Sequence, residues 1–189
     1  MSSLAGAGSV LLGANTLTIG SNNQSTTFSG VIQDTGGVTK SGTGTLTLTG
    51  SNTYTGNTTV TAGVLGISNT LGSGTGTGSV NVQGGTLAGK GIISGAVTIG
   101  TGSGSGAFLA PAAGTNVQAM LTIQSALIFN ADATYAYTFR AKRNRARTDE
   151  VIANGVTINS GALVALSGQT MGALTQGMTL ISNTLSQSH

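Results

Sequence analysis

Residues 44–50 read GTLTLTG. Leucine occupies every second position of the middle part and threonine fills the positions between, so in a strand the leucines share one face and the threonines the other. The flanking glycines suit tight turns, because glycine adopts positive φ without steric cost. This stretch therefore predicts a short strand, buried on one face, between two turns.

The same apolar–polar–apolar pattern recurs on both sides of this stretch. It is found at residues 17–19 (LTI), 80–82 (VNV), 97–99 (VTI), 121–123 (LTI) and 156–158 (VTI). Clusters of Gly, Ser, Asn and Thr, such as residues 72–78 and 102–106, separate these segments. The spacing of roughly 17 to 35 residues is too irregular for a hexapeptide solenoid, but it suits coils of three short strands joined by turns of variable length.

The predicted fold is all-β: a right-handed parallel β-helix (solenoid) of about eight coils that occupies residues 1–189 as one fragment. Coils of about 22 residues would stack at the inter-strand spacing of about 4.8 Å. Each coil would bury its inward side chains only against its neighbours, so the terminal coils should be the weakest unless they are capped. A β-sandwich is the competing fold. The frequent glycine-rich turns and the scarcity of charge favour the β-helix.

Composition excludes several classes of protein. Charged residues make up 6% of the 189 residues, against roughly 25% in an ordinary soluble domain. The mean hydropathy of +0.24 argues against disorder, and the 32 glycines argue against helices. The absence of cysteine excludes a disulfide framework. Residues 1–6 do not form a signal peptide and no apolar run is long enough for a membrane helix, so the targeting parts of a secreted protein would lie outside this fragment.

Residues 42–67 carry a resemblance to a known family. Residues 42–60 read GTGTLTLTGSNTYTGNTTV and residues 62–65 read AGVL. This run resembles the autotransporter-associated β-strand repeat, also called the passenger-associated transport repeat, whose pattern is G-T-G-x-L-x-L-x-G-x-N-T-Y-x-G-x-T-x-V. Residues 6–10, 28–32 and 84–99 are similar to the neighbouring coils of such proteins. Residues 126–184 are more loosely similar to the last coils of a passenger, the autochaperone region.

The resemblance implies a right-handed β-helix at the bacterial cell surface or outer membrane, or secreted. It implies a structural role as a stalk or as a secretion-assisting segment. The implied partners are the protein's own C-terminal membrane β-barrel and the outer-membrane assembly machinery, both outside this fragment. No cofactor is implied. The chain departs from its apparent relatives at residues 140–147, where such proteins usually have a short Gly-rich or acidic turn.

Those departing residues are strongly basic. Five of the seven cations of the chain lie here: Arg140, Lys142, Arg143, Arg145 and Arg147. Such a run can dock the phosphates of lipopolysaccharide or host glycans of the heparin type, as in an adhesin. The plainer hypothesis is a solvated loop that projects from the rod. The alternating Tyr135, Tyr137 and Phe139 suggest an inward strand face rather than a base-stacking platform, so specific nucleic-acid binding is not expected.

The chain offers little material for catalysis. Its one histidine is His189, and its acids are Asp34, Asp132, Asp149 and Glu150. Asp149 and Glu150 would point to opposite faces of a strand, and a pair such as Asp34 and Asp132 would have to converge in a cleft. Residues 84–91 approach the phosphate-binding loop pattern but lack its Ser/Thr and a following helix. We expect no catalytic, cofactor or metal site, and a polysaccharide-processing enzyme is disfavoured.

The signature run predicts the environment of three of its side chains. Leu46 should lie in the core, Asn52 should hydrogen-bond the turn backbone, and Tyr54 should cover the core edge with its hydroxyl in water. The outward threonines, at residues 45, 47 and 49 or 16 and 18, raise the alternative of ice binding. That function needs Thr pairs in register on successive coils, and the irregular spacing argues against it.

Overall fold

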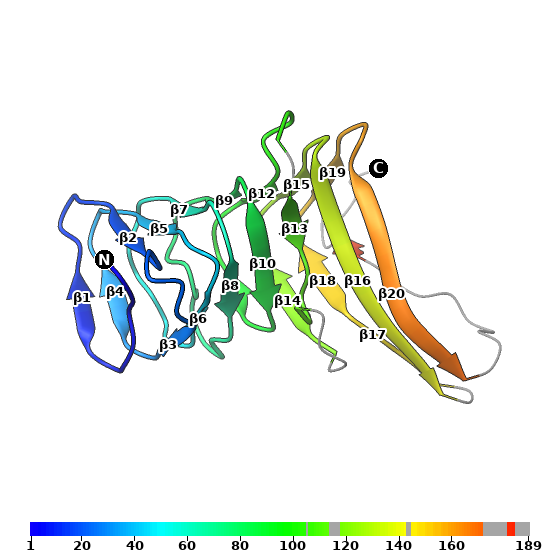
Figure 1. The fold of residues 1–189 in the computed structure, drawn as a ribbon, viewed down its shortest axis with the longest axis horizontal. Coiled ribbons are helices and arrows are strands. Elements are labelled where there is room, and N and C mark those ends of the chain that lie inside the picture. Colours follow the sequence, from blue (N-terminus) through cyan, green and yellow to red (C-terminus); the bar gives the residue numbers. More distant parts are fainter. Residues whose placement is uncertain (105, 114–117, 143–144, 172–180, 184–189) are drawn as a thin grey trace.

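The computed structural model describes residues 1–104, 106–113, 118–142, 145–171 and 181–183. In this part of the chain the regular structure consists of strands, with no helix. Figure 1 shows the strands stacked along one long axis, from the N-terminal coil to the C-terminal strands β16 and β20. The all-β prediction is therefore confirmed.

Two long parallel sheets run the length of the molecule (Figure 1). One contains β2 (Leu17–Ile19), β5 (Val38–Lys40), β7 (Thr58–Val60), β9 (Val80–Val82), β12 (Val97–Ile99), β15 (Leu127–Phe129) and β19 (Val156–Ile158). The other contains β3 (Thr26–Phe28), β6 (Thr45–Leu48), β8 (Val64–Ile67), β10 (Gly85–Gly89), β13 (Ala107–Leu109), β16 (Ala133–Lys142) and β20 (Leu163–Met171). The second sheet also includes β17 (Arg145–Thr148), which is antiparallel to β16.

Two smaller sheets complete the coils. β11 (Ile92–Ile93), β14 (Met120–Ile123), β18 (Glu150–Ala153) and β21 (Ile181–Asn183) form a third parallel sheet. At the N-terminal end, β1 (Ser9–Leu11) pairs in parallel with β4 (Val31–Gln33). Apart from the β16–β17 pair, strands that are neighbours in a sheet are parallel and lie one coil apart in sequence, so the architecture is a parallel β-solenoid and not a sandwich.

The register explains the irregular spacing of the sequence motifs. Along the first sheet, successive coils present Leu17, Val38, Thr58, Val80, Val97, Leu127 and Val156 as direct partners. The strands stay in register, and the loops between them take up every difference in coil length. The described residues thus contain seven coils in this sheet, against the expected eight or so.

The core is a stack of inward aliphatic side chains. The middle strands alternate buried, half-buried and buried residues, and Val80, Val97 and Leu127 are completely inaccessible. At the C-terminal end aromatic rings replace them: the ring centroids of Phe129 and Tyr135 lie 6.0 Å apart, and those of Tyr135 and Tyr137 lie 5.9 Å apart. Tyr135 and Tyr137 are both buried, as the alternation predicted.

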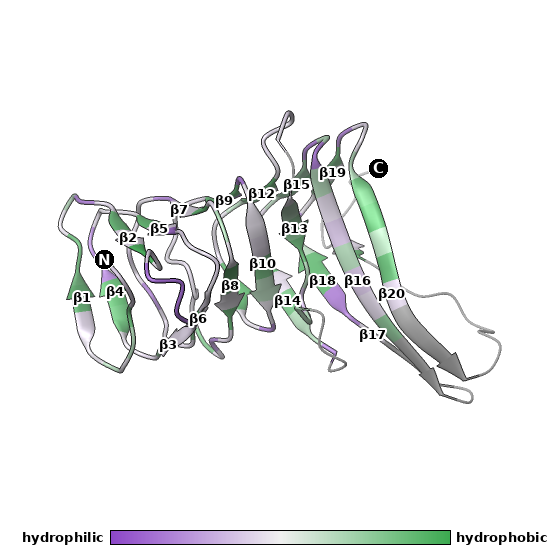
Figure 2. Ribbon diagram, in the orientation of Figure 1, coloured by the Kyte–Doolittle hydropathy of each residue, from purple (hydrophilic) through white to green (hydrophobic). Residues whose placement is uncertain are grey.

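The two ends of the solenoid differ in how the end coil is covered. At the N-terminal end the first residues lie against the first coil: the Met1 ammonium donates to the Thr18 carbonyl at 2.7 Å, and Gly6 bridges to Phe28. At the C-terminal end, Ile158, Leu163, Val164 and Leu166 are each more than half exposed. Figure 2 shows this apolar surface along the first part of β20. The C-terminal coil therefore leaves hydrophobic surface without cover from the described residues.

Leu46→Asp tests the inward face of the signature strand. Leu46 is 1% exposed and lies opposite Leu65 of the next coil, so an unpaired carboxylate there should lower the free energy of unfolding by about 4 kcal/mol or more. The matched change Thr47→Asp, on the outward face of the same strand, should cost about 1 kcal/mol or less. Urea denaturation followed by circular dichroism measures both. Equal stability of the two variants would place Leu46 outside the core.

Candidate functional site

The basic run forms two arms of a β-hairpin rather than a loop. β16 and β17 pair antiparallel from Phe139↔Thr148 to Lys142↔Arg145. We call residues 139–148 the basic hairpin; Arg143 lies outside the described residues. The hairpin extends the Tyr-rich strand, because β16 runs without a break from Ala133 to Lys142.

The register of the basic hairpin pairs like charges. Arg140 lies opposite Arg147, and Lys142 lies opposite Arg145. Like charges at directly opposed positions are unfavourable in an antiparallel pair. β20 pairs with the other edge of β16 up to Lys142↔Met171. Figure 1 shows β16 and β20 side by side, reaching below the level of the preceding coils.

The acids do not assemble into a catalytic pair. Asp34 accepts a hydrogen bond from Gly13 N at 2.9 Å in an N-terminal coil, whereas Asp132 lies near the C-terminal end and accepts from the N–H groups of Thr101, Gly102 and Gly104. Both carboxylates tie turns of adjacent coils together. They are held at opposite ends of the rod, so they cannot flank one substrate.

Asp149 is buried, while the adjacent Glu150 is half-buried. The carboxylate of Asp149 accepts hydrogen bonds from Ala119 N at 3.0 Å and from Thr138 N at 3.1 Å. Burial raises the pKa of Asp149 above its usual value, although these backbone donors oppose the shift. Its hydrogen bonds join three segments of the chain, which is a structural role.

The remaining sequence motifs also have no catalytic geometry. Residues 85–89 of the glycine-rich segment form strand β10, which lies between β8 and β13, so no phosphate-binding loop exists there. Within the described residues, no three His, Cys, Asp or Glu side chains gather as a metal site. His189 lies outside the described residues. Nor does the described part of the chain contain a helix of the length and apolarity that a membrane span requires.

Lys40 is a buried cation that sequence reasoning missed. It is 1% exposed, and its ammonium donates to the carbonyls of Ser41, Gly42 and Ala62 at 2.6, 2.9 and 3.2 Å. Burial lowers its pKa. Glycine is required beside it at residue 63, where φ is +66° and a Cβ would approach the backbone carbonyl oxygens of Gly42 and Gly44 to 2.4 and 2.5 Å. The alternation of β5, which points Val38 and Lys40 to one face, was the available signal.

The two polar residues of the signature both lie inside the coil stack. Asn52 accepts from Ile32 N at 2.8 Å and donates to the Gly74 carbonyl at 2.7 Å, so it bonds the backbone of both neighbouring coils. The expectation for Asn52 is confirmed. The expectation for Tyr54 is wrong, because its ring is fully buried and its hydroxyl lies 2.6 Å from the Thr58 hydroxyl. Turn bonding and core filling explain both residues without a ligand.

The outward threonines come closer to register than the motif spacing suggested. Thr18, Thr39 and Thr59 are direct partners on the first sheet, and Thr98 continues the column. The column is one residue wide on each three-residue strand and is interrupted by Asn81 and Ile128. A paired array that could order an ice-like water layer is therefore missing from this face.

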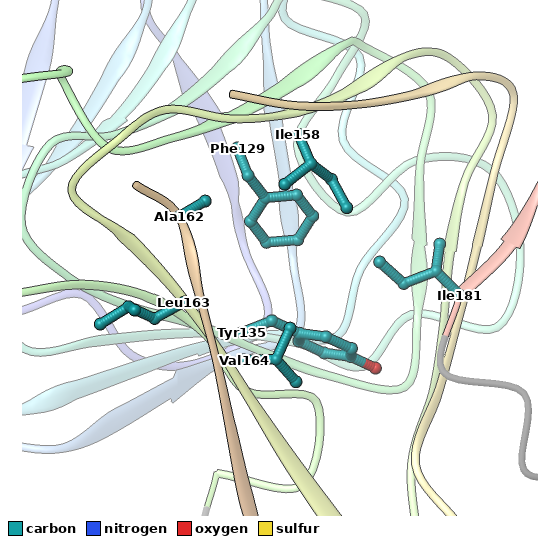
Figure 3. Close-up of a pocket in the computed structure, with 7 residues that line it drawn as sticks. All are labelled: Phe129, Tyr135, Ile158, Ala162, Leu163, Val164 and Ile181. Atoms are coloured by element: carbon teal, nitrogen blue, oxygen red, sulfur yellow. The ribbon is translucent and has the colours of Figure 1, made fainter. Parts of the chain in front are cut away.

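A small apolar pocket marks the open C-terminal end of the core (Figure 3). Its lining comes from the last coils: Phe129, Tyr135, Ile158, Ala162, Leu163, Val164 and Ile181. The pocket has a volume of about 20 Å³, which is room for little more than one water molecule. It is a gap between terminal side chains and not a ligand site.

Lys40→Met tests the buried ammonium. Removing it leaves carbonyls without their donor, so the free energy of unfolding at neutral pH should fall by about 1–3 kcal/mol. The folded pKa of Lys40 lies below 10.5, the ordinary value. In the window between these two values the unfolded chain binds more protons, so the stability of the parent rises with pH. The variant should lack this rise.

Urea denaturation at a series of pH values, up to about 10, measures the difference in stability between parent and variant. Tyrosine ionisation is common to both proteins and cancels in that difference. Lys90→Met, which replaces an exposed lysine, is the control and should follow the parent. A Lys40→Met curve parallel to the parent would show that the folded state does not perturb this ammonium.

Comparison with known proteins gives one family match. Residues 38–67, which run from β5 to the end of β8, match the family model of the passenger-associated transport repeat. No curated protein matches the chain. No solved structure matches it either. The matched segment contains Lys40 with its three carbonyl partners and the Leu46–Leu65 pair of the core. The chain thus carries a passenger-associated transport repeat, which is typical of autotransporter passengers, on a parallel β-solenoid.

Proposed function

We propose that this chain is a non-catalytic structural segment of an autotransporter passenger, a stiff stalk whose coil-by-coil folding assists secretion. The observation that carries the proposal is the continuous parallel register from β2 to β19, around the matched repeat. The repeat implies a surface-exposed or secreted protein. It also implies a translocator barrel as the partner during export. The outer-membrane assembly machinery would act on that barrel.

The stacking of coils supplies the physical basis for the stalk and for the assistance to secretion. Each coil satisfies its backbone and buries its inward side chains only against its neighbours, so an ordered coil is the template on which the next one folds. If the chain crosses the outer membrane in an extended form, each coil that folds at the cell surface lowers the free energy of the exported part. The exposed apolar residues Leu163, Val164 and Leu166 would provide such a template surface at the C-terminal end. Residues 126–184, the autochaperone-like coils, include this end.

The distribution of acids supports the absence of catalysis. Asp34, Asp132 and Asp149 each accept backbone N–H hydrogen bonds that hold coils together. Glycoside hydrolysis needs two carboxyl groups within about 5–10 Å across a cleft. The passenger-associated transport repeat family is generally non-catalytic. The same argument gives no reason to expect a cofactor.

Removing one coil in register tests the stalk. Thr58 and Val80 are direct partners on neighbouring coils, so deletion of residues 58–79 places Val80 where Thr58 was. In the full-length protein this deletion should preserve surface display, and the isolated solenoid should remain folded and shorten by about 4.8 Å in X-ray scattering. Deletion of residues 58–68, which ends within a coil, is the control and should abolish folding and display. Loss of display after the in-register deletion would contradict the stalk proposal.

The basic hairpin supports a second candidate, an adhesin that binds a host glycan or lipopolysaccharide. The observation in its favour is the juxtaposition of Arg140 with Arg147 and of Lys142 with Arg145. Opposed like charges on a two-stranded ribbon create a local field that draws polyanions. Such a role would be added to the stalk and would not replace it.

Replacing Arg140 and Arg147 together by Gln tests this candidate. If the hairpin binds sulfated glycans, the double variant should elute from immobilised heparin at clearly lower salt than the parent, because fewer counterions are released on binding. The control is the double change of Arg140 and Arg147 to Lys, which keeps both charges and should elute close to the parent. Equal elution of parent and double variant would reject the hairpin as a polyanion site.

A further inference from the structure

A groove larger than the terminal pocket lies on the outer face of β6, β8 and β10. It has a volume of about 360 Å³, within the range of about 300–1,000 Å³ that small-ligand sites occupy. Its residues come from three strands and from the segment after β13. They are Thr45, Thr47, Val64, Gly66, Ser68, Ala88, Gly89, Lys90, Pro111, Ala112, Ala113, Gln118 and Ala119.

The groove exists because two outward positions carry almost no side chain. Thr47 of β6 lies opposite Gly66 of β8, and Gly66 lies opposite Ala88 of β10. The outward side chains at this position are therefore small on β8 and β10. Residues 111–113, 118 and 119 form the facing wall. Gly89 N donates to the Pro111 carbonyl at 2.8 Å, which anchors that wall to β10. The hollow is thus built into the strand register and does not depend on the wall alone.

Several polar side chains of the groove have hydrogen-bonding capacity that the protein does not use. Within the described residues, no hydrogen bond engages the hydroxyls of Thr45, Thr47 and Ser68, the Gln118 amide or the Lys90 ammonium. Hydroxyls elsewhere on the coils do bond the backbone, as those of Ser41 and Thr61 do. The groove therefore gathers free donors and acceptors around a floor of small residues.

The residues that line the groove include one cation and no acid. Lys90 is exposed, and no ion pair joins it to a carboxylate of the described chain. No acid lines the groove. Asp149 reaches the wall only from inside the core, where its carboxylate accepts from Ala119 N. An anionic ligand would therefore meet an uncompensated cation and no repulsive group at the surface.

We propose that this groove binds an acidic oligosaccharide, with the sugar carboxylate on Lys90 and the sugar hydroxyls on Thr45, Thr47 and Ser68. A peptide is a poorer fit. β8 is hydrogen-bonded to β6 on one side and to β10 on the other, so the floor offers no free strand edge to which an extended peptide could pair. A hydroxyl-rich chain instead suits the unpaired hydroxyls. This site is separate from the basic hairpin and does not depend on the stalk role.

The test is a titration of the ¹⁵N-labelled chain with a galacturonic acid tetramer, followed by NMR. Binding should shift the amide signals of Thr45, Thr47, Gly66 and Lys90. Lys90→Gln should weaken binding about tenfold, which corresponds to a charge-assisted hydrogen bond. Thr47→Val, which keeps the shape of the side chain and removes the hydroxyl, should weaken it severalfold.

Gly66→Val fills the floor and should abolish binding. A Cβ at residue 66 meets only the Thr47 hydroxyl within 3.4 Å, at 3.3 Å, so the change should be tolerated by the strand. If this variant does not fold, Lys90→Gln and Thr47→Val still decide the question. The matched control is Thr98→Val, which removes an outward hydroxyl from the first sheet. It should bind like the parent.

Three results would overturn the proposal. The first is no spectral change at millimolar tetramer. The second is binding that Lys142→Gln weakens and Lys90→Gln does not, which would move the site to the hairpin. The third is equal binding of a neutral glucose tetramer, with no effect of Lys90→Gln, which would remove the acidic group from the recognition.

Discussion

The parallel hydrogen bonds between successive coils are the interaction on which the rest of this structure depends. A single coil is a loop with three short strands, and it can neither satisfy its own backbone nor enclose its apolar side chains. Stacking solves both problems together, because the register that pairs Val80 with Val97 also places their side chains in contact inside the rod. The buried polar groups, the glycines and the outward side chains all occupy positions that this stacking defines.

Polar groups enter the core where they strengthen the bonds between coils. Lys40 binds carbonyls of its own turn and of the next coil, and Asn52 bonds the coils before and after its own. Buried polar groups are tolerated when every bond is made. Glycine contributes the room for this arrangement, most plainly at Gly63, where a Cβ would clash with the backbone carbonyls of the preceding coil. The density of glycine in this chain is thus a packing requirement as well as a source of turns.

The outward side chains and the loops between strands are not fixed by the packing of the core. Because the inward positions are committed to packing, functional variety must come from outward side chains and from insertions between strands. The groove beside Gly66 arises from outward positions, and the basic hairpin arises where β16 continues past its pairing with β13. A solenoid can in this way vary its surface without disturbing its core.

Alternation in stretches such as residues 44–50, together with turn chemistry, was enough to predict an all-β solenoid, an inward Leu46 and a bonding role for Asn52. The run at residues 42–67 was enough to indicate the passenger repeat. These features are local, because side-chain direction along a strand and glycine turns depend only on neighbours in sequence.

Only the tertiary structure decided which coils stack on which, because loops of different length hide the register from a count along the chain. It therefore decided that Tyr54 is buried against Thr58, that Lys40 has carbonyl partners, that the basic run is a hairpin, and that Thr47, Gly66 and Ala88 line one groove. The physical reason is that contacts such as Lys40 with Ala62 and Thr47 with Gly66 join residues about one coil apart. The shorter contact of Tyr54 with Thr58 is buried because the neighbouring coils enclose it.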